Sequence, residues 1–379
     1  MAQRIKVMEI IARMNVGGPA VIVAELMRGI DATKFEVLLV TGYCDKSEAD
    51  YLDTIATDIK AIRIEGLGRS LSLKQDVVSF FSLVHLIRGE KPDVIHTHTA
   101  KAGVLGRLAS IIAGKGAIRI HTFHGHLLHG YFGKVKTYLV IVIERVLAKK
   151  TDLLVAVGTQ VRHDLLRARI GSAEKFVVSF PGLQLPATFD IASERKKLDL
   201  DSSTLYCTFV GRLTHIKRPD RLLDVASITK ARGVNIHFLI AGDGELAKDC
   251  QERIVEEKLP VTPLGWRKDI DEILASSDMV ILTSDNEGIP LTLIQASLAG
   301  LPIVATRVGS ISDIVVHGET GFLTETNPTR LADAIAALVV DPGLRKRMGD
   351  AGRQRALSQF SAHAMVSAHE DMYTSATRR

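Results

Sequence analysis

Short segments that are almost wholly apolar alternate with longer segments of helical pattern, and this alternation restricts the fold more than any other feature of the sequence. The short segments include VLLV and LLVAV, which have no polar face. Parallel strands covered by helices on both faces have this pattern, so we expect an α/β fold. In the first half, strands are predicted at residues 5–11, 36–41, 60–65, 93–97, 118–123, 152–157 and 176–180, and helices at 19–30, 73–89, 101–113, 134–149 and 159–169.

A break interrupts the alternation at residues 180–182 (FPG), and the charged segment SERKKLDLD follows, so we place a linker at 181–200. The 379 residues also exceed the roughly 250 to 300 over which a single core grows. We expect two doubly wound domains facing a cleft, at 1–182 and 183–360, with a helix at 361–379 as a candidate to cross back to the first domain. The second half is predicted to hold strands at 205–210, 236–241, 261–264, 279–282 and 303–305, followed only by helices at 329–340, 343–357 and 362–376.

The cysteines and the N-terminal residues bear on the compartment. Three cysteines lie far apart, without the spacing of a metal site or of a disulfide framework, which favours a reducing compartment. The chain starts directly in a predicted strand, and no apolar run reaches the roughly 20 residues that span a bilayer. We therefore expect a cytoplasmic protein that is soluble or bound to the inner face of the membrane. With a net charge of only +5, no nucleic-acid partner is expected.

The stretch at 283–309, TSDNEGIPLTLIQASLAGLPIVATRVG, leads from a short apolar strand into a helix. Its polar turn carries Glu287, Pro290 suits the first turn of the helix, and Gly300 ends it. The turn is therefore expected at the carboxyl end of a parallel strand, where open α/β sheets bind ligands. Glu287 and Gln295 are eight positions apart and could contact two ends of one extended ligand. A plain connection with a solvated acidic turn has the same spacing.

Two glycines, Gly17 and Gly18, lie between the first predicted strand and the first helix, in the sequence NVGGP. Glycine lets the backbone approach a ligand closely, and the free N–H groups of a helix start suit a phosphate. The sequence is not the GxGxxG fingerprint, so a nicotinamide cofactor is disfavoured. A tight turn without a ligand is the alternative.

Five histidines follow two neighbouring predicted strands: His96, His98, His121, His124 and His126. Histidines in such a place could bind zinc, donate to or accept from a sugar hydroxyl, or simply cap the strand ends. The zinc interpretation lacks a partner cysteine or a helical histidine pair, so we disfavour it.

Two cations, Arg212 and Lys217, follow Gly211 at the end of a predicted buried strand. A planar guanidinium and a point-like ammonium on one turn suit a diphosphate, although a solvated basic turn is the alternative. The sequences AGDGEL at 241–246 and LGW at 264–266 end two further predicted strands and are weak signals alone.

Together these motifs resemble the retaining glycosyltransferases of family 4. The resemblance runs in order through NVGG at 15–18, HTFH at 121–124, VGRL at 210–213 with Lys217, GDGEL at 242–246, LGW at 264–266, EGIP at 287–290 and GETG at 318–321. It covers nearly the whole chain, which makes it more specific than any single motif. It implies the GT-B architecture, in which two Rossmann-like, doubly wound domains face a cleft.

The resemblance also implies residue roles. His124 would bind a donor-sugar hydroxyl and Glu287 would hold the donor sugar. Arg212 and Lys217 would neutralise the leaving phosphates, and these four residues form the predicted catalytic set. The residues implied in donor binding are Gly17, Gly18, Gly242, Gly244, Glu245, Trp266, Gly288, Ile289, Pro290, Leu291, Thr292 and Gln295. Acceptor contacts are expected at His96, His98, Lys101, His121 and His126.

Position 295 departs from the family pattern, in which a second glutamate usually holds the ribose hydroxyls. Gln295 can still accept a hydrogen bond from a hydroxyl. The change removes a charge-assisted bond, which is roughly twice as strong as a neutral one. We therefore expect an altered donor affinity or nucleotide preference rather than a loss of activity.

The expected reaction is transfer of a hexosyl or N-acetylhexosaminyl group from a nucleotide sugar, a UDP-sugar in our prediction, with retention of configuration. No Asp-x-Asp motif accompanies the cations, so neither a metal nor another cofactor is expected. The leaving phosphate is expected to take the acceptor proton. A nucleotide-sugar 2-epimerase and a catalytically silent nucleotide-sugar-binding protein are the alternatives.

The segment 101–150 carries nine basic residues and one acidic residue, and within it YFGKVKTYLVIVIERVLAKK reads as an apolar helix flanked by lysines. Such a helix can lie on an anionic membrane surface, although a core helix has a similar pattern. Sequences that carry AKAG, as at 100–103, and HTFHGH, as at 121–126, resemble enzymes of capsule, O-antigen or exopolysaccharide assembly. The partners implied are a nucleotide-sugar donor, a lipid-diphosphate-linked or other saccharide acceptor, and the membrane surface.

Overall fold

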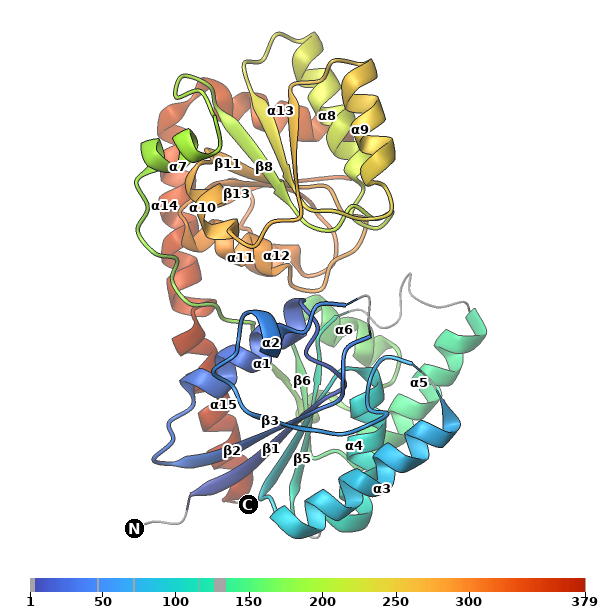
Figure 1. Ribbon diagram of the computed structural model, residues 1–379. Helices are drawn as coiled ribbons and strands as arrows, with labels where there is room; N and C mark the ends of the chain where they lie inside the picture. Colours follow the sequence, from blue (N-terminus) through green and yellow to red (C-terminus); the bar gives the residue numbers. More distant parts are fainter. Residues whose placement is uncertain (1–3, 46–47, 71, 115, 126–133, 379) are drawn as a thin grey trace. The chain divides into compact units, whose positions relative to one another are not determined.

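The computed structural model describes residues 4–378 except 46–47, 71, 115 and 126–133. The chain divides into two compact units (Figure 1). Unit 1 comprises Met1–Gly182 together with Ala362–Arg379, and unit 2 comprises Leu183–Ser361. The last helix of the chain is therefore part of the unit that the first strand begins.

Unit 1 is built on a seven-stranded parallel sheet with the order β3-β2-β1-β4-β5-β6-β7. Its strands are β1 (Ile5–Ile11), β2 (Phe35–Thr41), β3 (Ala61–Arg63), β4 (Val94–His98), β5 (Ile118–Phe123), β6 (Leu153–Ala156) and β7 (Phe176–Val178). Its helices are α1 (Gly18–Gly29), α2 (Tyr51–Thr54), α3 (Leu73–Glu90), α4 (Ala100–Ala113), α5 (Lys134–Lys149), α6 (Thr159–Arg167) and α15 (Ala362–Thr377), with a short 3₁₀ turn at Ala173–Lys175.

The two faces of this sheet are covered differently. Successive side chains of a strand point to opposite faces. Met8 and Ile10 of β1 pack in one core with Leu83 of α3 and Ala109 of α4. On the other face, α15 lies against β1 and α1, and the side chains there include buried polar groups. This second face holds His96 and His98, which contact Tyr373 of α15 and Glu9 of β1.

A buried ion pair joins α4 to α5. Arg107 and Glu144 are both almost completely buried, and Arg107 Nη2 lies 2.7 Å from each carboxylate oxygen. Arg107 Nε also donates to the Gly103 carbonyl at 2.7 Å. In a buried pair, the loss of one partner leaves the other charge without compensation. The α4–α5 contact therefore depends on both side chains being present.

Unit 2 is built on a six-stranded parallel sheet with the order β10-β9-β8-β11-β12-β13. Its strands are β8 (Tyr206–Val210), β9 (His237–Ala241), β10 (Val261–Gly265), β11 (Met279–Leu282), β12 (Ile303–Thr306) and β13 (Gly321–Thr324). Its helices are α7 (Ile191–Lys197), α8 (Pro219–Ala231), α9 (Ala247–Glu256), α10 (Ile270–Ala275), α11 (Leu291–Leu298), α12 (Ile311–Ile314), α13 (Pro328–Val340) and α14 (Pro342–Gln359).

Three short elements differ from the sequence-based expectation. We predicted only helices after residue 305, but β13 follows and pairs with β12 at the sheet edge. Its four residues, GFLT, lie between polar turns and alternate in burial, which gives too short a pattern to recognise. Helix α7 lies within the predicted linker, where Asp190 caps it by accepting from the Ala192 amide. Helix α2, similarly capped by Asp50, was also missed.

Each sheet has a point at which the strand order reverses. In unit 1 it lies between β1 and β4, and in unit 2 between β8 and β11. The loops that leave the carboxyl ends of such strands diverge and leave space for a ligand. In unit 2 these loops carry Lys217 and Glu287. Within the described residues, no helix has both the length and the apolar content needed to cross a bilayer.

Candidate active site

An ion pair between Lys217 and Glu287 lies at the carboxyl ends of β8 and β11. Lys217 Nζ donates to Glu287 Oε1 at 2.6 Å, and Ser284 Oγ donates to the same oxygen at 2.5 Å. The Glu287 side chain is only 9% exposed, whereas that of Lys217 is 24% exposed. Glu287 is thus held nearly out of solvent by two donors, and Lys217 keeps part of its ammonium in water.

The two loops are also bound to each other through the backbone. Thr283 Oγ1 donates to the carbonyls of Lys217 and Arg218, at 3.0 and 2.9 Å. The Asp285 amide donates to the Ile216 carbonyl at 2.9 Å. These contacts fix the position of the β8–α8 loop relative to the β11–α11 turn, and so they also position the two residues of the ion pair.

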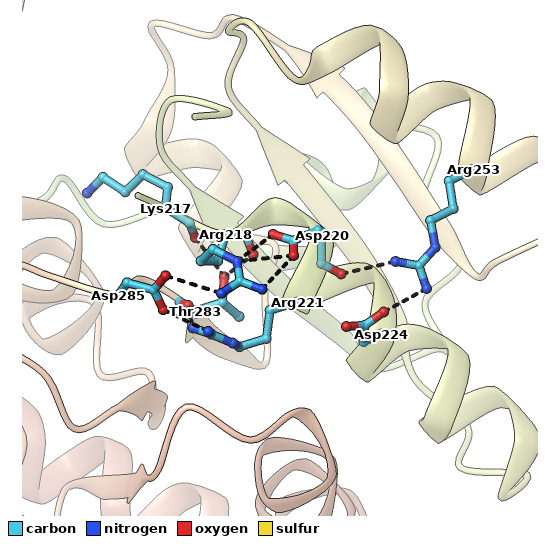
Figure 2. A network of polar contacts seen from close by, with 8 residues as sticks. All are labelled: Lys217, Arg218, Asp220, Arg221, Asp224, Arg253, Thr283 and Asp285. Carbon is cyan, nitrogen blue, oxygen red and sulfur yellow. Dashed lines mark hydrogen bonds and ion pairs between the residues drawn. The ribbon is translucent and has the colours of Figure 1, made fainter. Parts of the chain in front are cut away.

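Two arginines hold the acidic turn on its other side (Figure 2). Arg221 donates to the Thr283 carbonyl and, at 2.7 Å, to Asp285 Oδ1, and Arg218 Nη1 lies 3.1 Å from Asp285 Oδ2. Arg218 also pairs with Asp220, and Figure 2 shows the Lys217 side chain extending away from this network. Both carboxylates of the turn are therefore in ion pairs, which does not fit the alternative of a freely solvated acidic turn.

Two glycines allow the loops to approach this closely. A Cβ at Gly309, whose φ is +54°, would lie 1.8 Å from the Glu287 carbonyl oxygen. A Cβ at Gly242 would lie 1.9 Å from the Gly211 carbonyl oxygen. Both positions therefore require glycine for packing, whatever ligand the loops bind. The predicted donor contact of Gly242 stays a prediction.

Arg212 differs from the other cations of the loop. Its side chain is exposed, and among the described residues no ion pair or side-chain hydrogen bond engages it. The first turn of α11 follows the Glu287 turn at the same edge of the sheet, and Leu291 and Thr292 in it are partly exposed. An unpaired guanidinium and the free N–H groups of a helix start both attract an anion.

The other predicted donor-binding residues lie on the loops or helices of unit 2 and vary in exposure. Trp266 is 61% exposed. Glu245 and Gly244 are exposed, Gly288 is partly exposed, and Ile289 and Pro290 are buried. Gln295 on α11 points its amide at Asp271 of α10, with Nε2 3.5 Å from Oδ1. Burial raises the pKa of Asp271, and neighbouring Glu272 adds to the increase. The sequence analysis did not identify Asp271.

In unit 1, Gly17 and Gly18 lie at the start of α1, as predicted, and Gly17 is its N-cap. Lys101 Nζ is engaged by the carbonyls of Gly66 and Ser70 and by the Asp76 carboxylate, at 2.6–2.7 Å. Its contact with an acceptor stays a prediction. His126 lies outside the described residues.

Three of the predicted histidines are buried on the sheet of unit 1 with partners of their own. His96 Nε2 lies 2.7 Å from Thr122 Oγ1, and His121 Nδ1 lies 2.9 Å from Thr97 Oγ1. His98 lies between Glu9 and His124. A direct acceptor contact by these three histidines is untested and stays a prediction.

A carboxylate and a phenol that the sequence analysis did not identify complete this cluster. Glu9 Oε2 lies 2.6 Å from His98 Nε2, and Glu9 Oε1 accepts from the Tyr373 hydroxyl at 2.6 Å. His98 Nδ1 lies 2.8 Å from His124 Nε2, and Tyr373 Oη lies 2.7 Å from His96 Nδ1. Glu9 was hidden in an apolar strand, and Tyr373 is 364 positions away. No local sequence signal connects them.

Glu9, His96 and His98 each offer a ligand atom within 4.8 Å of the others, as a metal site would. However, His98 Nε2 and Glu9 Oε2 are 2.6 Å apart, which is a hydrogen-bond distance. Two atoms bound at about 2.1 Å to a tetrahedral zinc ion would lie about 3.4 Å apart. The geometry is therefore that of a hydrogen-bonded network.

Two family models match the chain. Residues 16–184 match the model described as Glycosyltransferase Family 4, and residues 190–355 match the model described as Glycosyl transferases group 1. Among curated proteins, the chain is 29% identical over 333 residues to an Escherichia coli UDP-Gal:alpha-D-GlcNAc-diphosphoundecaprenol alpha-1,3-galactosyltransferase, covering 86% of this chain and 85% of that one. It is 25% identical to the Staphylococcus aureus capsular polysaccharide biosynthesis glycosyltransferase CapM, covering 81% and 83%.

Solved structures agree on the fold. Anabaena HepE, crystallised with UDP and glucose, superposes with a TM-score of 0.82 at 19% identity over 98% of this chain and all of that one. Sucrose-phosphate synthase from Thermosynechococcus elongatus superposes with a TM-score of 0.80 at 20% identity, covering 98% and 99%.

Proposed function

Because the chain belongs to the family 4 glycosyltransferases and has their GT-B fold, we propose that it is a retaining, metal-independent transferase that moves a sugar from a UDP-sugar to a hydroxyl of a lipid-linked or other saccharide acceptor. We place it in the synthesis of a cell-surface polysaccharide. The names of the E. coli and S. aureus relatives support this donor, acceptor and setting. The UDP bound to HepE supports the same donor.

The observation that carries the proposal is the set of charges around the Lys217–Glu287 pair. One edge of the unit 2 sheet carries the 2.6 Å pair and the start of α11. The same edge carries Arg212, which has no ion-pair partner among the described residues. As the bond between the anomeric carbon and the phosphate oxygen breaks, negative charge develops on the leaving diphosphate. Cations and helix N–H groups that are already in place stabilise that charge without reorganisation.

In this mechanism Glu287 accepts hydrogen bonds from hydroxyls of the donor sugar. Ser284 and Lys217 orient its carboxylate from one side, since both donate to Oε1. Oε2 has no hydrogen-bond partner within the described residues and remains for the sugar. The acceptor oxygen forms its bond on the face that the phosphate leaves, and the phosphate takes the acceptor proton. No step requires a metal.

We further propose that unit 1 rests on an anionic membrane surface through α5. Exposed apolar side chains recur on this helix at Tyr138, Leu139, Val142, Ile143 and Val146. Lys149 and Lys150 follow at its end and are exposed. Exposed apolar residues beside lysines are typical of interfacial helices. Co-sedimentation with vesicles containing phosphatidylglycerol tests this: Leu139→Glu/Val146→Glu should remain in the supernatant, while the wild type and a Val255→Glu control on α9 should pellet.

The transferase proposal is tested by a donor screen. UDP- and GDP-sugars are incubated with a polyprenyl-diphosphate-linked sugar in the presence of a chelator, and product is followed for wild type, Lys217→Ala and Glu287→Ala. One donor should be consumed by the wild type alone, with the anomeric configuration retained in the product. Turnover only after metal addition would refute metal independence. Donor that binds but stays intact with every acceptor, or that epimerises without one, would refute transfer.

A further inference from the structure

A chain of buried hydrogen bonds in unit 1 leads from a carboxylate to His124. It runs from Glu9 through His98, at 2.6 Å, to His124 Nε2, at 2.8 Å. Glu9 and His98 are both fully buried. His124 Nδ1 is also buried and has no hydrogen-bond partner within the described residues. A buried polar atom without a partner destabilises the fold, so its retention indicates that this position receives an atom of a ligand.

The direction of each hydrogen bond follows from its partners. Tyr373 donates to one oxygen of Glu9, so a carboxylate there accepts from His98 on the other oxygen. His98 Nε2 therefore carries its proton. A neutral His98 then has only a lone pair at Nδ1, and His124 must donate to it from Nε2. A neutral His124 is left with a lone pair at Nδ1.

The direction in which each pKa is shifted agrees with the protonation states that this chain of hydrogen bonds requires. Burial opposes ionisation of Glu9, but its interactions with His96 and the hydrogen bond from His98 hold its pKa well below the ordinary value. Burial lowers the pKa of His98, and His96 lowers it further. The hydrogen bond to Glu9 raises it, but the net shift is downward. Burial also lowers the pKa of His124 well below its usual value, and the nearby His98 and His96 add to this.

We propose that Glu9 and His98 are positioning residues that fix His124 in the tautomer with the proton on Nε2, so that Nδ1 always presents a hydrogen-bond acceptor to a hydroxyl of the substrate. This inference rests on the proposed function and on the role that the family resemblance implies for His124, which is to contact a hydroxyl of the donor sugar. An imidazole free to change tautomer would present a donor for part of the time. The carboxylate removes that alternative, as the aspartate does in a serine protease triad.

The tautomer can be measured directly. In protein labelled with ¹⁵N-histidine, a long-range ¹H–¹⁵N correlation spectrum separates the two neutral tautomers, and loss of one signal in His124→Gln assigns it among the 13 histidines. The wild type should show His124 protonated on Nε2. Protonation on Nδ1 would overturn the inference, whatever the enzyme's activity. This measurement needs no variant of the buried carboxylate, so it does not depend on whether such a variant folds.

Glu9→Gln tests the cause. Its amide oxygen can still accept from Tyr373, so its NH₂ group faces His98 and must donate to Nε2. The whole chain then reverses, and His124 should carry its proton on Nδ1. Tyr373→Phe is the matched control, because it removes the other hydrogen bond of Glu9 and should leave the His124 tautomer unchanged. An unchanged tautomer in Glu9→Gln, or a reversed one in Tyr373→Phe, would overturn the inference.

Kinetics then connect the tautomer to function. With the donor identified by the screen, Glu9→Gln should lower kcat/KM by about 10- to 100-fold, the loss expected when one acceptor in the site becomes a donor. If the tautomer reverses and kcat/KM does not change, His124 does not accept from the substrate and the functional part of the inference fails. If the wild type transfers no sugar at all, the proposed function fails while the tautomer result stands.

Discussion

The loss of stability on breaking the Lys217–Glu287 pair should depend on which of the two residues is replaced. Lys217→Met leaves a carboxylate that is 9% exposed with a single remaining donor, Ser284. Glu287→Gln leaves an ammonium that is already 24% exposed and can turn into water. We therefore expect the lysine variant to be the less stable of the two, although both remove the same 2.6 Å contact.

The magnitude follows from these exposures. A buried charged group that loses a partner costs about 1–3 kcal/mol, so Lys217→Met should lower the free energy of unfolding by about 2 kcal/mol. A partly exposed pair contributes about 0–1 kcal/mol, which bounds the cost of Glu287→Gln. For a unit of this size, 1 kcal/mol corresponds to about 2–4 °C in Tm. The unit 2 transition of Lys217→Met should therefore lie roughly 2–8 °C below that of Glu287→Gln.

Thermal unfolding of the full chain, followed by calorimetry, measures this difference, and turnover is assayed on the same samples. Both variants should lose about 100- to 1000-fold in kcat, as when one preorganised group of a transition-state site is removed. A lower Tm for Glu287→Gln than for Lys217→Met would refute the reasoning from burial. Activity loss that merely follows the loss in Tm would refute the assignment of the pair to the chemistry.

Other substitutions separate stability from activity. Arg212→Met should leave Tm within about 2 °C of the wild type yet abolish most turnover, because the guanidinium is exposed and unpaired among the described residues. Glu144→Gln should cost about 3–5 kcal/mol by leaving the buried charge of Arg107 uncompensated, and Arg107→Met/Glu144→Leu should recover most of it in the same denaturation assay. Gln295→Glu places a carboxylate beside Asp271, whose pKa is already raised. Since deprotonation of such a pair is unfavourable in the folded state, stability should fall relative to the wild type as pH rises from about 4 to about 7, which denaturant unfolding across pH measures.

The alternation of strands and helices was predictable because burial on both faces makes parallel strands apolar. The first strand, Ile5–Ile11, was predicted to the residue, and α11 lies between Pro290 and Gly300, the two residues expected at its ends. Short elements were not predictable in this way. Strand β13 has four residues, of which only Gly321 and Leu323 are buried. Four positions cover only about one helical turn or two strand repeats, which is too few to distinguish the two structures.

Candidate site residues could be predicted where they lie on the loops that leave the strand ends. Glu287 precedes Gly288, Lys217 lies on the loop that leaves the strand end at Gly211, and the structure brings the two side chains together. Partners that come from distant helices were not predictable. Asp271 carries no motif and meets Gln295 only because α10 packs beside α11. Glu9 occupies one position of an apolar strand, and its partner Tyr373 is 364 positions away.

The return of α15 to unit 1 sets an order of events during synthesis. Glu9 leaves the ribosome early, but Tyr373 follows 364 positions later. At about 5–20 residues per second, the wait lasts roughly 20 to 70 s. All of unit 2 is translated within that interval and can fold as a nascent chain, while β1 still lacks the helix that buries its carboxylate. Completion of the first unit is therefore a late step of translation. A chaperone that recognises exposed sheet faces would have this whole interval in which to bind the uncovered face of β1.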